Sequence, residues 1–197
     1  YMTKRKICPA CQYPLLVCIC GAITQTVVDT EIIILQHPSE KNRAKNTARL
    51  ISLVIPNTET FVGESAADFE LVKQRLLARD SKDTSIAVLF PSPDSKIFSE
   101  ALKPSVQRVQ TLILVDGTWR KAKKMWQLNP WLWPFVVFRL EVGSISRYRI
   151  RKGSEAGGIS TLEAVALALE ILEGADTEPL YKAFEAMQDK WQQFSEY

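Results

Sequence analysis

The chain has 197 residues, of which 46% are hydrophobic and 24% are charged, and its formal net charge at pH 7 is +3. This length fits one globular domain of ordinary composition. The sequence has no run of about 18 apolar residues, which excludes an integral membrane protein. No apolar stretch of a secretory signal follows its basic first residues, so we expect a cytoplasmic protein.

The charge is distributed unevenly along the chain. Residues 120–152 carry nine basic side chains against Glu141 alone, a net charge of +8, whereas residues 153–197 carry two lysines against nine acidic side chains, a net charge of −7. So dense a basic block is typical of proteins that bind a polyanion such as nucleic acid. The alternative is a solvated basic face that the acidic C-terminal helices balance.

All four cysteines lie in the first 20 residues, as the close pairs Cys8 with Cys11 and Cys18 with Cys20. Structural zinc sites take four thiolates at tetrahedral corners, and close pairs supply such ligands from two tight turns. Disulfides are the alternative, but each local pairing would close a very small loop. A redox Cys-x-x-Cys motif would leave the second pair unexplained. We therefore predict a structural zinc site in an N-terminal segment, residues 1–24.

Beyond the cysteines, the pattern of strands alternates with that of helices. Short runs of β-branched and apolar residues predict strands at residues 27–35, 61–62, 85–90, 111–115 and 135–140. Helical periodicity predicts helices at residues 40–54, 68–79, 120–128, 162–172 and 181–194. This alternation predicts one α/β domain over residues 25–197, with a mainly parallel sheet and flanking helices.

Polar residues gather where the predicted strands end, and ligands of open parallel sheets bind at the carboxyl ends of strands. Asp116 is the strongest candidate, because a carboxylate that ends a buried strand has little structural reason to lie there unless it faces a ligand cleft. The sequence contains neither a GxGxxG motif nor a Walker A loop, so we do not expect a conventional Rossmann or P-loop nucleotide site.

Several segments, taken together and in order, resemble those of the DTW-domain family of tRNA-uridine aminocarboxypropyltransferases. They are the cysteine pairs, QHPSE, NTARL, LFPS, DGTW followed by AKKM and NP, and YRIRK followed by STLEA. The resemblance implies transfer of the 3-amino-3-carboxypropyl group from S-adenosylmethionine to N3 of a tRNA uridine in the variable loop, which releases methylthioadenosine. It also implies a fold related to the knotted SPOUT methyltransferases, with residues 25–197 as the catalytic domain.

The resemblance also implies roles for particular residues. The candidate catalytic residues are Asp116 and Thr118. The candidate residues for binding S-adenosylmethionine, the expected co-substrate, are Leu89, Phe90, Pro91, Ser92, Asp116, Gly117, Thr118, Trp119, Ser160, Thr161 and Glu163. The candidate residues for binding tRNA, the expected partner, are Arg49, Lys121, Lys123, Lys124, Arg147, Arg149, Arg151 and Lys152. The sequence does not determine the oligomeric state, because no self-complementary apolar surface can be identified in it, and we favour a monomer.

The sequence leaves the role of Asp116 open. Its carboxylate can accept the N3 imide proton of uridine, although an ordinary aspartate, with a pKa of about 3.9, is a weak base. It can instead hold the amino group or the sulfonium charge of the cofactor. Arg49 or Arg149 can grip the cofactor's carboxylate.

Other candidates also have a structural interpretation. Ser160 and Glu163 fit a capping box at the start of a helix. Trp119 fits a packed wall residue, and His37 fits a hydrogen-bonded, packed histidine.

Two alternative functions remain, a SPOUT-type RNA methyltransferase and a non-catalytic RNA-binding protein with a zinc knuckle.

Overall fold

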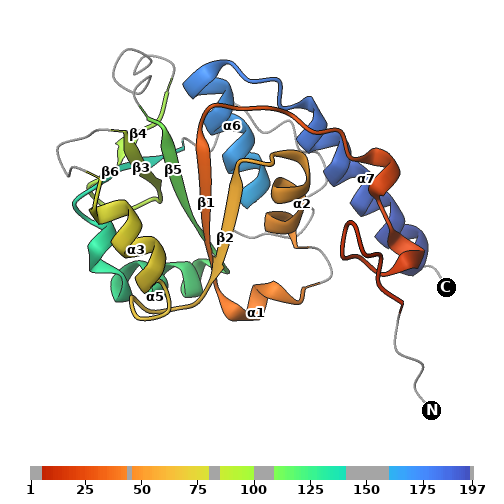
Figure 1. The fold of residues 1–197 in the computed structure, drawn as a ribbon, viewed down its shortest axis with the longest axis horizontal. Coiled ribbons are helices and arrows are strands. Elements are labelled where there is room, and N and C mark those ends of the chain that lie inside the picture. The colour runs from red at the N-terminus through yellow and green to blue at the C-terminus, as the bar shows by residue number, and fades with distance from the viewer. Residues whose placement is uncertain (1–5, 44–45, 80–84, 100–108, 141–159, 196–197) are drawn as a thin grey trace.

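A parallel sheet runs through the middle of the computed structural model, which describes residues 6–43, 46–79, 85–99, 109–140 and 160–195 (Figure 1). The strand order is β2-β1-β5-β3-β6-β4, and every pairing is parallel. The strands are β1 (Glu31–Gln36), β2 (Thr58–Val62), β3 (Ile86–Leu89), β4 (Lys96–Ile97), β5 (Thr111–Asp116) and β6 (Val136–Arg139). The predicted α/β architecture with a mainly parallel sheet is confirmed.

Helices cover both faces of the sheet. They are α1 (Pro38–Lys41), α2 (Thr47–Val54), α3 (Glu70–Leu77), α5 (Trp119–Leu128), α6 (Thr161–Glu173) and α7 (Glu178–Ser195). Figure 1 shows α3 and α5 on one face and α2, α6 and α7 on the other. None of the helices in the described part of the chain is long and apolar enough to cross a membrane.

Alternate side chains of β1 supply two apolar cores, because successive residues of a strand point to opposite faces. Ile32 and Ile34 pack toward α2, α6 and α7, whereas Ile33 and Leu35 pack toward α3 and α5. A strand that is buried on both faces is apolar almost throughout, which explains the continuous apolar run IIIL in β1.

The N-terminal segment packs into the first of these cores. It contains two short 3-10 helices, η1 (Leu15–Val17) and η2 (Cys20–Ala22). Tyr13, Val17 and Ile19 are buried in the cluster that α2 and α7 form. The hydroxyl of Tyr13 donates to the carbonyl oxygen of Asn46 at 3.0 Å. The cysteine-bearing segment therefore shares its hydrophobic core with the α/β domain.

The single helix predicted over residues 40–54 is wrong, because the structure has two helices there. The side chain of His37 caps α1 by accepting from the backbone N–H of Ser39, and Pro38 opens that helix. The side chain of Asn46 caps α2 by accepting from the backbone N–H of Arg49. Asn46 and Thr47 therefore begin a second helix, although helical periodicity alone favours one continuous helix.

Two further differences concern strands. The strand predicted from Val27 begins only at Glu31, because the backbone N–H groups of Asp29 and Thr30 donate to the carboxylate of Glu173 and not to a strand. The two-residue strand β4 was not predicted, because so short an element leaves no periodic signal. Residues 141–159, between β6 and α6, lie outside the described residues, and the knotted topology stays a prediction.

Candidate functional site

Asp116 ties together three parts of the fold. In the parallel ladder it lies opposite Gln36, at the carboxyl ends of β5 and β1. Its Oδ2 accepts a hydrogen bond from Nε2 of Gln36 at 2.8 Å, and its Oδ1 accepts one from the hydroxyl of Thr161 at 2.5 Å. Thr161 is the first residue of α6, and the partial positive charge at a helix N-terminus favours a carboxylate. The site thus forms where two strand ends meet the start of a helix.

The expectation that Asp116 faces an open cleft needs correction. Its exposed fraction is 9%, and each of its carboxylate oxygens accepts a hydrogen bond from a side chain. A buried carboxylate with such partners also stabilises the fold, because removing it would leave polar groups unsatisfied. Asp116 therefore holds the site together as well as lying in it.

Gln36 and Asn46 belong to the same hydrogen-bond network, although neither was among the predicted site residues. Gln36 is 2% exposed, and its Nε2 also donates to Oδ1 of Asn46 at 3.2 Å. The side-chain amide of Asn46 donates in turn to the carbonyl oxygens of Glu40 and Lys41. The sequence signal that could have identified this network is Gln36, a polar residue at the end of a mostly apolar strand. A buried side-chain amide needs hydrogen-bond partners, so such a residue indicates other polar groups nearby.

The N-terminus of α6 carries the capping box that the sequence predicted as one interpretation of Ser160 and Glu163, and this interpretation is confirmed. The carboxylate of Glu163 accepts from the backbone N–H and the hydroxyl of Ser160, at 2.8 and 2.7 Å. The hydroxyl oxygen of Ser160 accepts from the backbone N–H of Glu163 at 3.2 Å. These two side chains therefore satisfy each other, and a role in cofactor binding stays a prediction.

The loops after β3 and β5 bring together most of the other predicted cofactor-binding residues. Leu89 and Phe90 are buried, whereas Pro91 and Thr118 are exposed and Ser92 is half-buried. A Cβ on Gly117 would lie 3.3 Å from Cβ of Lys121, so this turn packs closely on α5. The ring of Trp119 stacks on that of Phe90, with 5.9 Å between the ring centroids. Trp119 is 59% exposed, so it is not the packed wall residue that one interpretation expected.

Carboxylates pair with two of the lysines that were predicted to bind RNA. Nζ of Lys124 lies 3.0 Å from Oε1 of Glu64, and Nζ of Lys121 lies 3.6 Å from Oε1 of Glu40. The ammonium group of Lys124 holds the pKa of Glu64 below its usual value. His37 is hydrogen-bonded as the structural interpretation expected, since its Nε2 lies 3.3 Å from the same Glu64 oxygen.

Lys123, another of these predicted residues, is also on α5, whereas Arg49 is on α2. The guanidinium of Arg49 donates to the carbonyl oxygens of Gln12 and Lys41 and lies over the ring of Tyr13, 5.0 Å from its centroid. Arg49 thus fastens the N-terminal segment to α2. The predictions for Arg147, Arg149, Arg151 and Lys152 lie outside the described residues.

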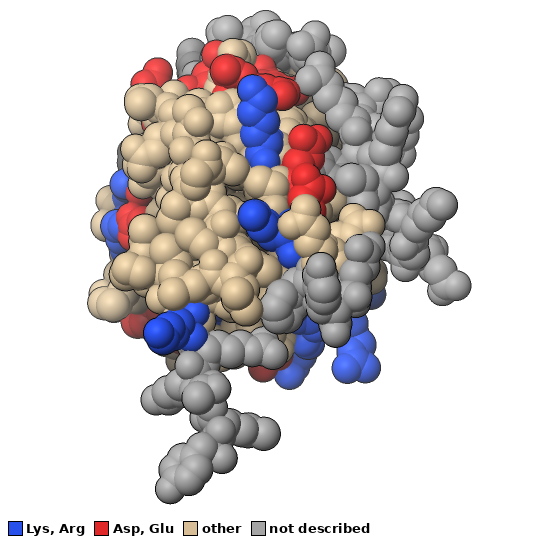
Figure 2. All heavy atoms as spheres, turned by 90° about the vertical axis from the view of Figure 1, so that its right-hand side faces the viewer, with Lys and Arg blue, Asp and Glu red and all other residues tan. Residues whose placement is uncertain are grey.

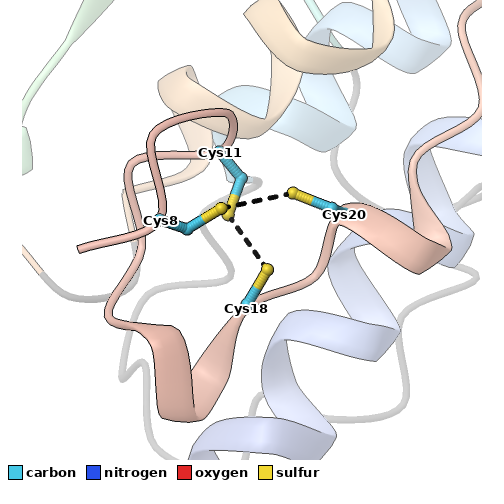
Figure 3. A group of neighbouring side chains, drawn as sticks. All are labelled: Cys8, Cys11, Cys18 and Cys20. Carbon is cyan, nitrogen blue, oxygen red and sulfur yellow. Dashed lines mark hydrogen bonds between the residues drawn. The ribbon is translucent and has the colours of Figure 1, made fainter. Parts of the chain in front are cut away.

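The four cysteine side chains point toward one another (Figure 3). Their Sγ atoms all lie within 4.8 Å of one another, and the Cys8–Cys20 and Cys11–Cys18 Sγ pairs are 3.6 and 3.7 Å apart. Four sulfurs at about 2.3 Å from a zinc ion would be separated by about 3.8 Å, so the geometry fits a tetrahedral site. All four are free cysteines, which excludes the disulfide alternative in this structure.

The local electrostatics also suit a cation. Hydrogen bonds from the backbone N–H groups of Cys11 and Ala10 lower the pKa of Cys8 to about 6. The neighbouring thiols, Cys18 first among them, raise the pKa of Cys20 to about 12. Four thiolates this close repel one another, and a divalent cation between them would offset that repulsion. Cys8, Cys11, Cys18 and Cys20 therefore form a site whose donor set and geometry fit zinc.

The fold and these two sites define a class of protein, a parallel α/β domain with a four-cysteine cluster that could hold a metal ion and a polar centre at the carboxyl edge of its sheet. Residues 5–192 match the family model described as the DTW domain. The chain belongs to the DTW domain family. No solved structure matches the chain.

Relatives in three animals and a plant carry related names. The chain is 32% identical over 172 residues to tRNA-uridine aminocarboxypropyltransferase 2 of Drosophila melanogaster, which covers 86% of this chain and 68% of the fly protein. It is 30% identical to the protein of the same name in Mus musculus, where it spans 57% of the relative's length. It is 26% identical over 212 residues to tRNA-uridine aminocarboxypropyltransferase A of Arabidopsis thaliana, covering 86% of this chain and 74% of the plant protein.

Proposed function

We propose that this chain is a tRNA-uridine aminocarboxypropyltransferase that uses S-adenosylmethionine as its donor and modifies N3 of a uridine in the variable loop of tRNA. Family membership and the names of the relatives support the proposal. One observation on the structure carries it furthest. Segments that lie far apart in the sequence meet through the hydrogen bonds of Gln36 and Thr161 to Asp116.

The proposed reaction is a nucleophilic substitution at carbon. The sulfonium of S-adenosylmethionine makes the carboxypropyl carbon beside it electrophilic, so the donor itself supplies the leaving group. The uridine N3–C bond forms while the C–S bond breaks, and its electron pair stays on sulfur in methylthioadenosine. The imide proton must leave N3 for a base, because nitrogen attacks well only as that proton departs.

In this proposal Asp116 is the carboxylate beside the reacting groups and Thr118 lies in the same turn. The carboxylate either accepts the imide proton or holds the positively charged part of the donor. Leu89–Ser92, Gly117 and the start of α6 at Ser160, Thr161 and Glu163 surround the donor, and Trp119 begins α5 beside them. The buried residues in this set contribute through their backbone groups and by packing.

The proposed tRNA surface includes α5, which carries four basic residues and no acidic one. Figure 2 shows a different face, the one on which α7 lies in Figure 1, where uncharged side chains cover most of the described surface. The described positive and negative charges on that face are scattered, so they do not form a continuous basic surface that could bind phosphates. Arg147, Arg149, Arg151 and Lys152 are proposed to bind tRNA from their sequence alone, because they lie outside the described residues.

Further features complete the proposal. Zinc is structural and bound by the four cysteines, with residues 1–24 as the zinc-binding segment and residues 25–197 as the catalytic domain. The fold is SPOUT-like and knotted, the protein is cytoplasmic and it acts as a monomer. The insertion of β5 between the two earlier strands β1 and β3 supports the relation to a non-sequential, SPOUT-like topology.

Two donor labels test the proposal directly. Purified protein is incubated with tRNA and S-adenosylmethionine that is labelled either at the methyl carbon or at the carboxyl carbon. We expect only the carboxyl label in tRNA, with methylthioadenosine as the second product. Methyl label in tRNA would instead identify an RNA methyltransferase. Transfer of neither label, with tRNA still bound, would identify a non-catalytic RNA-binding protein.

A further inference from the structure

Aromatic rings stack beside the carboxyl edge of the sheet. The ring of Phe90, which is buried, stacks with those of both Trp126 and Trp119, which lie two helical turns apart on α5. The centroid separations are 4.8 Å to Trp126 and 5.9 Å to Trp119, with interplanar angles of 16° and 18°. Trp119 is therefore held in one orientation by a buried partner although more than half of its own surface is exposed.

A second exposed tryptophan lies at the other end of this group. The ring centroid of Trp133 is 6.5 Å from that of Trp126, and its indole N–H donates to the carbonyl oxygen of Trp126 at 3.2 Å. Trp133 is 54% exposed. Single exposed apolar residues are common on proteins, but two indoles fixed by contacts at the ends of one row of aromatic rings form an oriented aromatic surface.

Positive charge lies along the same side of α5. Lys123 follows Trp119 by four residues and precedes Trp126 by three, so helical geometry places it on the stripe that both rings share. Arg120 lies next to this stripe. Within the described part of the chain, no hydrogen bond or ion pair engages the side chain of Lys123 or Arg120. Lys121 and Lys124, on the opposite side of the helix, pair with carboxylates. The unpaired charges thus lie beside the exposed rings.

We propose that the exposed face of Trp119 is a stacking platform for an unpaired uridine of single-stranded RNA, with Lys123 and Arg120 binding the flanking phosphates. Aromatic rings bind bases by stacking, and basic residues beside them bind the backbone, which is the combination present here. The platform follows Asp116 by three residues at the same sheet edge. The inference rests on the proposed function for the identity of the RNA as tRNA, but its binding test does not require turnover.

Binding of short oligonucleotides tests the platform. The probes are fluorescein-labelled pentanucleotides of uridine and of dihydrouridine, which have equal charge, whereas the saturated ring of dihydrouridine is not planar and stacks poorly. Affinity is measured by anisotropy at fixed salt. We expect Trp119→Ala to weaken uridine binding roughly 5- to 150-fold, which corresponds to the loss of one stacked base. Trp119→Phe should keep most of the affinity, and Trp119→Ala should change dihydrouridine binding less than about twofold.

The matched control is Leu71→Ala on α3, since Leu71 is also a large, exposed apolar side chain but lies away from the stack. It should leave both affinities unchanged. Uridine affinity that stays within about twofold in Trp119→Ala, or an equal loss with both probes, overturns the inference. Weaker binding of S-adenosylmethionine in Trp119→Ala, with unchanged oligonucleotide affinity, also overturns it and assigns the ring to the adenine of the donor.

The donor-label experiment separates this inference from the proposed function. If wild-type protein transfers the carboxyl label but Trp119→Ala binds uridine normally, the platform is wrong and the proposed function stands. If uridine binding depends on Trp119 while wild-type protein transfers neither label, the platform stands and the proposed function is wrong.

Discussion

The hydroxyl of Tyr13 and the backbone carbonyl of Asn46 form a 3.0 Å hydrogen bond that joins the cysteine-bearing segment to the edge of the candidate site. The side chain of Asn46 accepts from Gln36, and Gln36 donates to Asp116. The four-cysteine site and the carboxylate centre are therefore linked through buried polar groups.

The cysteine site should bind one zinc ion per chain. Four convergent Sγ atoms match the tetrahedral thiolate set of a structural zinc site, and the binding energy of a structural zinc adds to folding stability. Elemental analysis of purified protein should give a stoichiometry near one, and Cys11→Ser should lower both the zinc content and the unfolding midpoint. A zinc-free protein with two disulfides would show that the interpretation is wrong.

Tyr13→Phe should destabilise the protein by about 1 kcal/mol at pH 8, the usual net contribution of a buried hydrogen bond. Burial also raises the pKa of Tyr13 above its usual value of about 10. A raised pKa means that the neutral hydroxyl is favoured in the folded state. The stabilisation from Tyr13 is thus complete below pH 10 and declines as the pH rises above that value, where the unfolded chain ionises.

Denaturant unfolding of wild type and Tyr13→Phe at pH 8 and pH 10.8 checks this prediction, because contributions of the other titrating groups cancel in the difference. The stability difference between the two proteins should shrink at the higher pH. A difference that is independent of pH would show that the Tyr13 hydroxyl does not stay protonated in the folded protein.

Asp116→Ala should cost about 1–3 kcal/mol of stability, because it leaves the buried amide of Gln36 without its 2.8 Å acceptor. Asp116→Asn should reduce the stability less than Asp116→Ala. The new amide can still accept from Gln36 through its oxygen, and the hydroxyl of Thr161 can turn to accept from its NH₂ group. Thermal unfolding of the two variants measures this order, and the reverse order would argue against the described network.

The same pair of variants separates the two proposed roles of Asp116 in transfer. If the carboxylate accepts the imide proton, both variants should lose roughly 10²-fold or more in rate, the usual size of a general-base effect. If it holds the donor, Asp116→Ala should weaken binding of S-adenosylmethionine while Asp116→Asn keeps most of it. Rates and donor affinities equal to wild type would leave Asp116 with a structural role only.

Lys123 and Lys124 should contribute differently to tRNA binding although they are neighbours in the sequence. Lys124 pairs with Glu64 at 3.0 Å, so it already has a counter-charge. A lysine that contacts phosphate releases a counterion, and its loss flattens the salt dependence of affinity by about one unit of slope. We expect this flattening for Lys123→Ala and a smaller change for Lys124→Ala, measured by filter binding across a salt series. Equal flattening in both variants would show that the ion pair with Glu64 does not keep Lys124 from contacting phosphate, and no flattening in either would place the phosphate contacts elsewhere on the protein.

The sequence predicted the sheet well because its central strands are apolar on both faces. The runs at residues 85–90 and 111–115 correspond to β3 and β5, and the helices at α5, α6 and α7 are found within a few residues of their predicted ends. The break between α1 and α2 was missed because capping by Asn46 depends on where its side chain points. Apolar periodicity does not report that orientation.

The candidate site shows the same limit. The position of Asp116 at a strand end could be predicted, but its burial depends on Thr161, which comes 45 residues later in the chain. The pairing of Lys121 and Lys124 with carboxylates likewise depends on residues brought near by the fold. Charge density along a sequence predicts a basic region, whereas only the three-dimensional arrangement separates paired lysines from unpaired ones.

The place of β5 in the sheet has a consequence for synthesis on the ribosome. β5 pairs with β1 on one side and with β3 on the other, although both of those strands precede it in the chain. Until residues 111–116 have emerged, each of those apolar strands lacks the neighbour that covers one of its edges. Unpaired strand edges invite association with other chains. The nascent protein is thus most prone to aggregate while its first half is exposed and its central strand is still being made.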